Sequence, residues 1–427
     1  MRRFTFVLTL TFTGTLIAQS PEPRPLPPSI TGVPGQPLIP LTPTAGVVPE
    51  TKLAPISRYQ NLAALPPETA QAVLGLRTGS DWLLKRQQAN GRFVAGVNLD
   101  TKSIIPTGTE FEQSLSTWAV CQAARFMGDE KLNLAGSQAI LSLMTLTTDS
   151  PDGCKVPVLP WGVNNIPTGF AAVLALAIFE LPDADDKTSA DAVKLCRFIK
   201  KQMQKDGSIA WQTHTKIDVS GENLQPGLAL LALATAYRVT GDATFKDSCL
   251  SGVTYYRDAF RRQPNAVMAG TLLPAFVECH RLTKSDAART ATFELADWLI
   301  TQQATATTVK TPAWAGSFVD PDSVSEPNIT TAYVLKGLAA ACQLARNEAD
   351  LQRYPRYRAA TVEVLKFTGS LQYTAENAVA FEAGIRQQYV LGGVRRTLTG
   401  TIVTAENTAL VVLGFQRFLE SGADSRD

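Results

Sequence analysis

Carboxylate, amide and aromatic side chains recur in this sequence at one kind of position, just before segments that are apolar on nearly every side. The carboxylates and amides are Glu112, Glu222, Glu326, Asn328, Glu406 and Asn407, and the aromatic residues in nearby loops are Phe93, Trp161, Trp211 and Trp314. A carboxylic acid can protonate a glycosidic oxygen, and an aromatic face can cover the C–H face of a sugar ring. The pattern therefore favours a glycan ligand, with Glu112 or Glu222 as the acid or base.

Three further residues fit this interpretation. His214 follows Trp211 in the same kind of loop, and a histidine can act as a base near neutral pH. Arg92 or Arg395 could neutralise an acidic sugar if the reaction were an elimination. The plain alternative is that the acidic and amide residues only cap helices, and that the tryptophans only pack loops over the helix ends.

Sharper catalytic motifs do not hold. Asp183 to Asp186 match the Asp-x-Asp-Asp acid of some terpene cyclases, but they follow an apolar segment and read as a helix N-cap. Asp247, Cys249 and His280 have the letters of a zinc site but fall inside predicted helices, and no Gly-x-Ser-x-Gly nucleophile motif occurs. We predict no metal site, and the sequence leaves both catalysis and any cofactor undetermined.

The elements that would position these residues are helices of two alternating kinds. Amphipathic helices with one charged face are predicted over 68–88, 131–146, 189–204, 244–260, 286–303 and 356–372. Helices apolar nearly all round are predicted over 112–127, 168–181, 226–241, 269–283, 330–345 and 406–419. Helices with a charged stripe lie at a surface, and helices apolar on every side are enclosed. The sequence predicts an all-α protein, an (α/α)6 toroid of six outer and six inner helices.

One phrase is written twice in the chain. "DWLLKRQQ" at Asp81 is followed by "ANGRF", and "DWLITQQ" at Asp297 is followed by "WAGSF". Gln87, Gly91 and Phe93 fit the Gln-x-x-x-Gly-x-Trp/Phe loop of the prenyltransferase and squalene oxidase repeat. The chain thus resembles the terpenoid cyclase and protein prenyltransferase toroid superfamily, and it is similar to secreted bacterial toroid proteins of no assigned activity. The resemblance implies a toroid; terpenoid cyclisation is the least favoured activity, because of the predicted export and the aspartate positions.

The ends of the chain predict export. Residues 1–18 carry two arginines and an apolar run too short to span a membrane, which indicates a signal peptide. Residues 19–56 are a proline-rich linker without a fold of its own, 57–421 the toroid, and 422–427 a tail. We expect a secreted or periplasmic protein with no transmembrane segment in its mature chain.

The composition narrows the partners. Forty basic against thirty-eight acidic residues give no electrostatic footprint for nucleic acid. Of six cysteines, five fall in apolar helical segments, so most are expected to be small buried side chains, with one or two disulfides left open. Two hypotheses remain: an exported toroid that binds and processes a glycan, or a non-catalytic toroid that binds a polysaccharide or cell-envelope ligand as a scaffold.

Overall fold

The computed structural model describes residues 54–159, 167–210, 219–309, 311–318, 325–380 and 389–424, without the side chains of 219–222 and 379–380. The outer helices in these ranges are α1 (Pro67–Arg86), α3 (Glu130–Met144), α5 (Asp186–Lys201), α7 (Ala243–Arg262), α9 (Asp286–Gln302) and α11 (Arg353–Ser370). The inner helices are α2 (Glu110–Met127), α4 (Pro167–Glu180), α6 (Val219–Thr240), α8 (Ala266–Thr283), α10 (Thr331–Asn347) and α13 (Ala405–Ser421).

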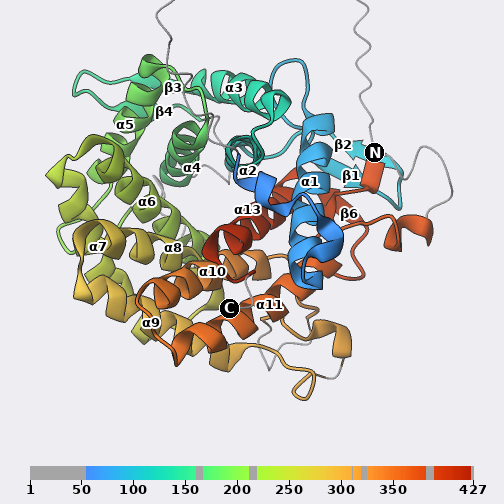
Figure 1. Ribbon diagram of the computed structural model, residues 1–427. Helices are drawn as coiled ribbons and strands as arrows, with labels where there is room; N and C mark the ends of the chain where they lie inside the picture. Colours follow the sequence, from blue (N-terminus) through green and yellow to red (C-terminus); the bar gives the residue numbers. More distant parts are fainter. Residues whose placement is uncertain are drawn as a thin grey trace, which may run out of the picture. The chain divides into compact units, whose positions relative to one another are not determined.

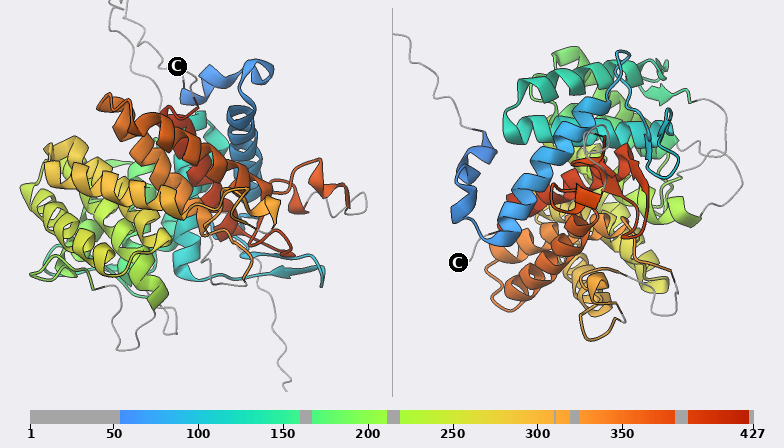
Figure 2. Two further views of the ribbon diagram at one scale, coloured as in Figure 1. Left: turned by 90° about the horizontal axis from the view of Figure 1, so that it is seen from below. Right: turned by 90° about the vertical axis from the view of Figure 1, so that its right-hand side faces the viewer.

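The inner helices form a closed ring. Each packs against the next in the order α2, α4, α6, α8, α10 and α13, and α13 packs against α2 again. The outer helices cover the ring, and Figure 1 shows α1 (blue) beside α13 (red), a neighbourhood that the side views in Figure 2 repeat. The predicted (α/α)6 toroid is confirmed. Each hairpin buries its apolar face only by packing on its neighbours, which is why the fold closes on itself.

The inner helix α6 begins earlier than predicted. The sequence predicts this helix over 226–241, and proline is a residue that favours the first turn of a helix. The structure starts α6 at Val219 and holds Pro226 inside the helix. The neighbouring Gln225 is 1% exposed, so the helix is already packed in the ring just before Pro226. Tertiary packing here outweighs the preference of proline for a helix start.

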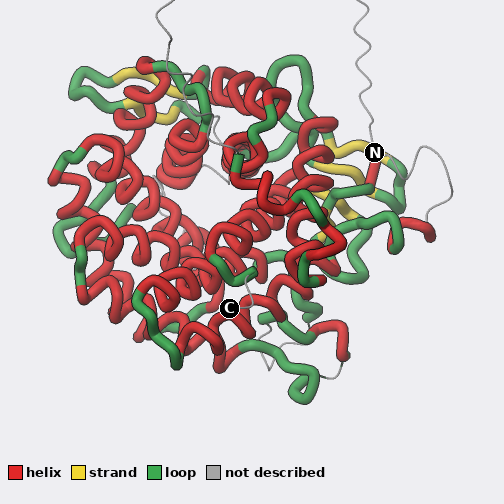
Figure 3. The backbone as a smooth tube through the Cα atoms, in the orientation of Figure 1, coloured by secondary structure: helices red, strands yellow, loops and turns green. Residues whose placement is uncertain are grey.

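Short strands that the sequence analysis did not predict join the first repeat of the ring to the last, a junction called here the seam. A four-stranded antiparallel sheet has the order β2 (Ser103–Ile105), β1 (Gly96–Asn98), β6 (Ile402–Thr404) and β5 (Val394–Arg395). A second pair, β3 (Thr147–Asp149) and β4 (Lys155–Pro157), lies apart from it in Figure 3. Because β1 comes from the first repeat and β6 from the last, the sheet joins loops about 300 residues apart in sequence.

A glutamine and a glycine clamp explain the repeated phrase. Gln87 Nε2 donates to the carbonyl oxygens of Gly91, in its own loop, and of Ala135, in the next outer helix. Gln303 does the same with Gly316 and Ala360. The repeat therefore ties the end of one outer helix to the body of the next.

A third clamp closes the circle. Gln372, at the end of α11, donates to the carbonyl oxygens of Gly392 and of Gly75 in α1. The clamp glycines Gly91, Gly316 and Gly392 all have φ between 82° and 90°, which glycine adopts without strain. This third copy escapes a search for the motif because nineteen residues separate its glutamine from its glycine.

Other expectations can be compared directly. All six cysteines are buried and free, so no disulfide forms. Asp185 caps α5 by accepting from the Thr188 N–H, which confirms the cap reading of the Asp183–Asp186 motif. His280 is 6% exposed, and its ring nitrogens contact the Ser285 carbonyl at 2.9 Å and Glu348 at 3.3 Å. None of the helices described above has the length and apolarity needed to cross a membrane.

Candidate functional site

A cavity of about 220 Å³ opens between the N-terminal ends of the inner helices α2 and α13. Glu112, Gln113 and Ser116 of α2 line one side of this rim cavity. Glu406 of α13 and the preceding Thr404 line the other side. Two carboxylates from the ends of the repeat series therefore face one space.

Hydrogen bonds fix both helix ends at this rim. In α2, Thr109 and Glu112 form a capping box, in which Glu112 Oε2 accepts from the Thr109 N–H at 2.7 Å and Thr109 Oγ1 accepts from the Glu112 N–H at 3.2 Å. In α13, Thr404 Oγ1 accepts from the Asn407 N–H. The Ala405 N–H donates to the Ala95 carbonyl, so the seam sheet holds the start of α13 against the first repeat.

The environment of Glu406 favours its neutral form. The pKa of this carboxyl group is raised to about 7. Burial is the main cause and the nearby Glu112 a smaller one, while Arg396 opposes the shift. Burial also raises the pKa of Tyr333 in α10, with Glu406 as the second cause, so the phenol lies within electrostatic range of the carboxyl. A partly buried acid near neutral pKa beside a second carboxylate is an arrangement suited to general acid and base chemistry.

The structure brings three of the predicted residues to this rim. Glu112 and Glu406 share the cavity, and Asn407 lies next to Glu406 with 5% of its surface exposed. Asn265, another helix-start amide, acts only as the N-cap of α8 by accepting from the Met268 N–H. Residues predicted at helix starts therefore either line the rim cavity or cap a helix, and Glu112 does both.

Several residues predicted to bind the ligand make contacts within the protein instead. Phe93 is 1% exposed and lies in the core, with its backbone bonded to the Gln113 amide. Arg92 forms an ion pair with Glu110, so its charge is already matched. Arg395 donates to the Ser370 carbonyl and covers the ring of Tyr373 at 5.1 Å. These contacts argue against direct ligand binding by Phe93, Arg92 or Arg395.

Two further rim residues also hold loops. Glu326 accepts from the Thr399 N–H and hydroxyl at 3.1 and 2.6 Å. Asn328 accepts from the Thr330 N–H at 2.9 Å and bridges to Thr397. The Glu326 side chain thus supports the loop that leads into α13, the Asn328 side chain holds the start of α10, and neither lines the rim cavity. Trp314 is half-buried in a short 3-10 helix (Pro312–Trp314), and its role as a sugar platform stays a prediction.

The remaining predicted residues cannot be placed. Trp161, Trp211 and His214 lie outside the residues that the structure describes. Glu222 belongs to the first turns of α6, but its side chain is not described. Their roles stay predictions. Within the described ranges, no three His, Cys, Asp or Glu side chains are grouped in a way that would hold a metal ion.

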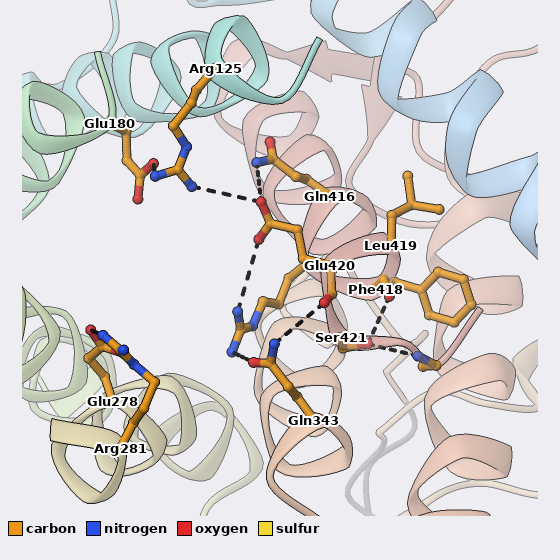
Figure 4. Close-up of polar contacts among 12 residues, drawn as sticks. Arg125, Glu180, Glu278, Arg281, Gln343, Gln416, Phe418, Leu419, Glu420 and Ser421 are labelled. Carbon is orange, nitrogen blue, oxygen red and sulfur yellow. Dashed lines mark hydrogen bonds and ion pairs between the residues drawn. The ribbon is translucent and has the colours of Figure 1, made fainter. Parts of the chain in front are cut away.

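A second opening lies at the other end of the ring and was missed by the sequence analysis. This chamber, a cavity of about 210 Å³, is lined by residues from the middle to the C-terminal ends of the inner helices, together with Lys336 from the first half of α10. Its charged residues are Arg125, Glu180, Arg238, Glu278, Arg281, Lys336, Arg417 and Glu420. Figure 4 shows Arg125, Glu180 and Glu420 directed into the space between these helices.

Ion pairs cross the chamber between neighbouring inner helices. Arg125 contacts Glu180 at 2.6 Å and Glu420 at 3.8 Å, linking α2 to α4 and α13. Glu278 accepts from Arg238 at 3.2 Å and from Arg281 at 2.7 Å. The glutamates of the chamber therefore all have basic partners.

The signal for the chamber was present in the sequence as a stripe. In α13, the residues Leu410, Leu413, Arg417 and Glu420 follow at intervals of three, four and three, and all line central cavities. The same spacing places Trp118, Gln122 and Arg125 of α2 on one line. Residues at this spacing share one helix face, so a charge at the end of an apolar stripe predicts a charged chamber mouth.

An apolar layer separates the two openings. A small void of about 20 Å³ in the middle of the ring is lined mostly by apolar side chains, Trp118, Leu228, Leu231, Tyr333, Leu410 and Leu413 among them, and it adjoins the chamber through Trp118, Leu231 and Lys336. The centre of the ring is therefore a packed core rather than a pore. Over the residues that the structure describes, the fold defines this protein as an α/α toroid, with the rim cavity at one end of the ring and the chamber at the other.

Comparison with solved structures supports that class. The chain is similar to the unsaturated glucuronyl hydrolase of Bacillus sp. GL1, with a TM-score of 0.58 and 14% identity over 82% of this chain and 96% of that chain. It is similar to the cellobiose 2-epimerase of Bacillus thermoamylovorans B4167, with a TM-score of 0.59 and 12% identity over 82% and 99%. An α-1,6-mannanase variant of Salegentibacter sp. HEL1_6 gives a TM-score of 0.57 and 11% identity over 83% and 100%.

At such identities the likeness shows the fold alone. No family model matches the chain, and no curated protein matches it either. The resemblance to the terpenoid cyclase superfamily, which rested on the glutamine and glycine loop, is not confirmed as a family assignment. The structure gives that loop a mechanical role, as the clamp between outer helices.

Proposed function

We propose that this protein binds a glycan in the rim cavity and cleaves it, with Glu406 as the general acid and Glu112 as the partner carboxylate. The observation that carries the proposal is the pairing of these two side chains in one cavity, together with the pKa of about 7 for Glu406. The glycan-related names of the three similar toroids support the ligand class.

The chemistry needs both carboxyl groups. Glu406, in its neutral form, would give its proton to the glycosidic oxygen as the bond between that oxygen and the anomeric carbon breaks. Glu112, as a carboxylate, would either activate a water molecule or attack the anomeric carbon itself. Gly108 allows this placement, because a side chain there would press on Glu112 Oε2.

One observation favours the non-catalytic alternative. The capping box engages Glu112 Oε2 with the Thr109 N–H, so the carboxylate already has a structural task. In that case the toroid would bind a polysaccharide or a cell-envelope glycan and leave it intact. Export to the periplasm or the medium, as the signal-like N-terminus predicts, would bring either form of the protein to such a ligand.

The test is a screen of the purified protein against neutral and acidic polysaccharides, with products detected as new reducing ends. We expect Glu406→Gln and Glu112→Gln each to lower kcat by at least about a hundredfold, the usual contribution of a general acid or base. Activity of the unaltered protein should fall as the pH rises through about 7, because Glu406 then loses its proton.

The matched control is Glu130→Gln, the same chemical change at an exposed first-turn glutamate of an outer helix. It should leave activity unchanged. Glutamine at 112 keeps an acceptor for the capping box, so the fold should survive that substitution. Glycan binding without products in any variant would identify a binding protein, and full activity of both rim variants would refute the assignment.

A further inference from the structure

The chamber at the C-terminal ends of the inner helices holds more basic than acidic side chains. Five basic residues line it, Arg125, Arg238, Arg281, Lys336 and Arg417, against three glutamates, Glu180, Glu278 and Glu420. The glutamates are matched by arginines within 4.0 Å. With Lys336 protonated, two positive charges are in excess.

Polar atoms on the chamber wall lack hydrogen-bond partners among the described residues. The Lys336 Nζ is buried 3.3 Å from the centre of the Trp118 ring, a cation–π contact, and no acceptor reaches it. The Trp118 Nε1 and the Gln122 Oε1 are also unpartnered, although these residues are only 3% and 6% exposed. Buried polar groups usually have partners, so this wall is built to meet something that enters the chamber.

We propose that the chamber is a second ligand site, which takes the anionic group of a small molecule, a carboxylate or a phosphate, at Lys336. This inference goes beyond the rim cavity and does not depend on glycan cleavage there. An anion would supply the acceptor that Lys336 lacks and would offset the excess positive charge.

The walls suggest the rest of the ligand. Leu176, Leu231 and Pro274 line the chamber between the charged residues, and they offer apolar surface to a short carbon chain or ring. The Trp118 N–H is a donor and can contribute a second hydrogen bond to the anion. A compact molecule with one anionic group and an apolar body fits these surfaces.

Binding at this site should take up a proton. Burial lowers the pKa of Lys336 to about 7; Arg417 lowers it as well, while Glu180 and Glu420 raise it. Arg125, Arg238, Arg281 and Glu278 complete the charges that line the chamber, and burial itself raises the pKa of Glu180. Above pH 7 the amine is mostly neutral, so an arriving anion must recruit a proton to it.

Isothermal titration calorimetry of the whole protein tests this directly. The probes are inorganic phosphate and hexanoate, with hexanamide as an uncharged match for hexanoate. We expect binding of an anion but not of hexanamide. For hexanoate, which stays ionised above pH 6, the affinity should be constant between pH 6 and pH 7 and should weaken above pH 7. At pH 8, hexanoate titrations in buffers of different ionisation enthalpy should show uptake of up to one proton per site. The stronger of the two anions tells whether the natural group is a phosphate or a carboxylate.

Three variants separate the site from general charge effects. Lys336→Met should weaken anion binding at least about tenfold, the usual effect of losing a hydrogen bond to a charged group. Lys336→Arg should still bind the anion but should take up no proton on binding, because arginine stays charged. Lys366→Met, at an exposed lysine of α11 that pairs with Glu363, is the matched control and should change nothing.

The outcomes distinguish this proposal from the one for the rim. Glu406→Gln should leave anion binding intact, and loss of glycan activity should not affect it. If the unaltered protein binds neither anion, or if Lys336→Met binds as tightly as the unaltered protein, the chamber is not the proposed site.

Discussion

The two ends of the toroid use the same inner helices for opposite purposes. In α13, Glu406 lies in the rim cavity and Glu420 in the chamber, fourteen residues or roughly 20 Å further along the helix. At the rim, long loops and the seam sheet enclose two carboxylates. At the chamber, short turns leave a mouth with excess positive charge. The inward face of α13 therefore carries a residue of the rim cavity at one end and a residue of the chamber at the other.

The difference shows how burial alone can create two contrasting sites. At the rim, desolvation neutralises an acid, since the pKa of Glu406 rises to about 7. At the chamber, desolvation neutralises a base, since the pKa of Lys336 falls to about 7. Because the charged form is the costly one in each case, the two ends should respond to pH in opposite directions.

The largest effect is expected from Lys336→Met. The unfolded chain binds a proton at this lysine up to about pH 10.5 and the folded chain only up to about pH 7, so the cost of burying the charge is greatest below pH 7 and fades as the pH rises towards 10. The shift corresponds to about 3–5 kcal/mol. The variant should therefore gain stability of this order at pH 6, measured by urea unfolding.

The gain should shrink steadily between pH 7 and pH 10. Methionine keeps the apolar stem that packs against Trp118 while it removes the charge. Equal gains in stability at pH 6 and pH 10 would mean that the charge on the lysine does not destabilise the folded state. The contrast between the two ends would then have no electrostatic basis.

Glu406→Gln should show the opposite pH dependence with a smaller size. The folded chain keeps this proton up to about pH 7 and the unfolded chain only up to about pH 4.5, so the glutamate destabilises the fold above pH 7 and not below pH 4.5. For a partly buried side chain the cost is about 2 kcal/mol. The variant should be more stable than the parent at pH 8 and indistinguishable from it at pH 4.

If the stabilities of Glu406→Gln and of the unaltered protein changed with pH in parallel, this expectation would be wrong. The double variant with Lys336→Met supplies a further check. Lys336 lines the chamber and Glu406 the rim cavity, and neither group is among the causes of the other's pKa shift, so their effects should add at each pH. A marked departure from additivity would mean that the apolar layer around Trp118 and Tyr333 transmits one charge to the other end.

Most of the fold could be predicted from the sequence, because helical periodicity records burial. The six apolar segments became the inner ring, and the six amphipathic ones the outer ring. The early start of α6 and the strands of the seam sheet were not predictable. Pro226 is a strong local signal that tertiary packing overrides, and strands of two or three residues depend on partners about 300 residues away.

The candidate site was only half predictable. Glu112 and Glu406 follow from their positions at helix starts, but the same rule also selected Glu326, which holds a loop, and Asn328, which holds the start of α10. A helix-start residue caps or faces a cavity depending on the rotation of its helix, and that rotation is set by packing. The chamber could not be predicted from the residues at helix starts, because its charged residues, such as Arg417 and Glu420, lie near helix ends.

A pair of glycines offers the smallest and most local test of the contrast between the ends. Gly392 belongs to a long rim loop and has a φ of 90°, while Gly241 belongs to a short turn at the chamber end and has a φ of 70°. A Cβ at 392 would press on the Thr78 carbonyl oxygen of α1, whereas one at 241 meets nothing within 4 Å. Alanine at either position adopts a left-handed conformation, at a cost of about 1–2 kcal/mol.

Gly392→Ala should therefore lose about 1–3 kcal/mol more stability than Gly241→Ala, because the backbone must shift to relieve the contact with the Thr78 carbonyl oxygen. The shared backbone strain cancels in this comparison, so the excess reports the clamp alone. Because the strand after Gly392 is bonded to α13 through the Val394 N–H and the Thr408 hydroxyl, the variant should also disturb Glu406 and reduce rim activity. Anion binding in the chamber should persist. If both variants lose stability equally, the rim is no more tightly held than the short turns, and the clamp does not fix the candidate site.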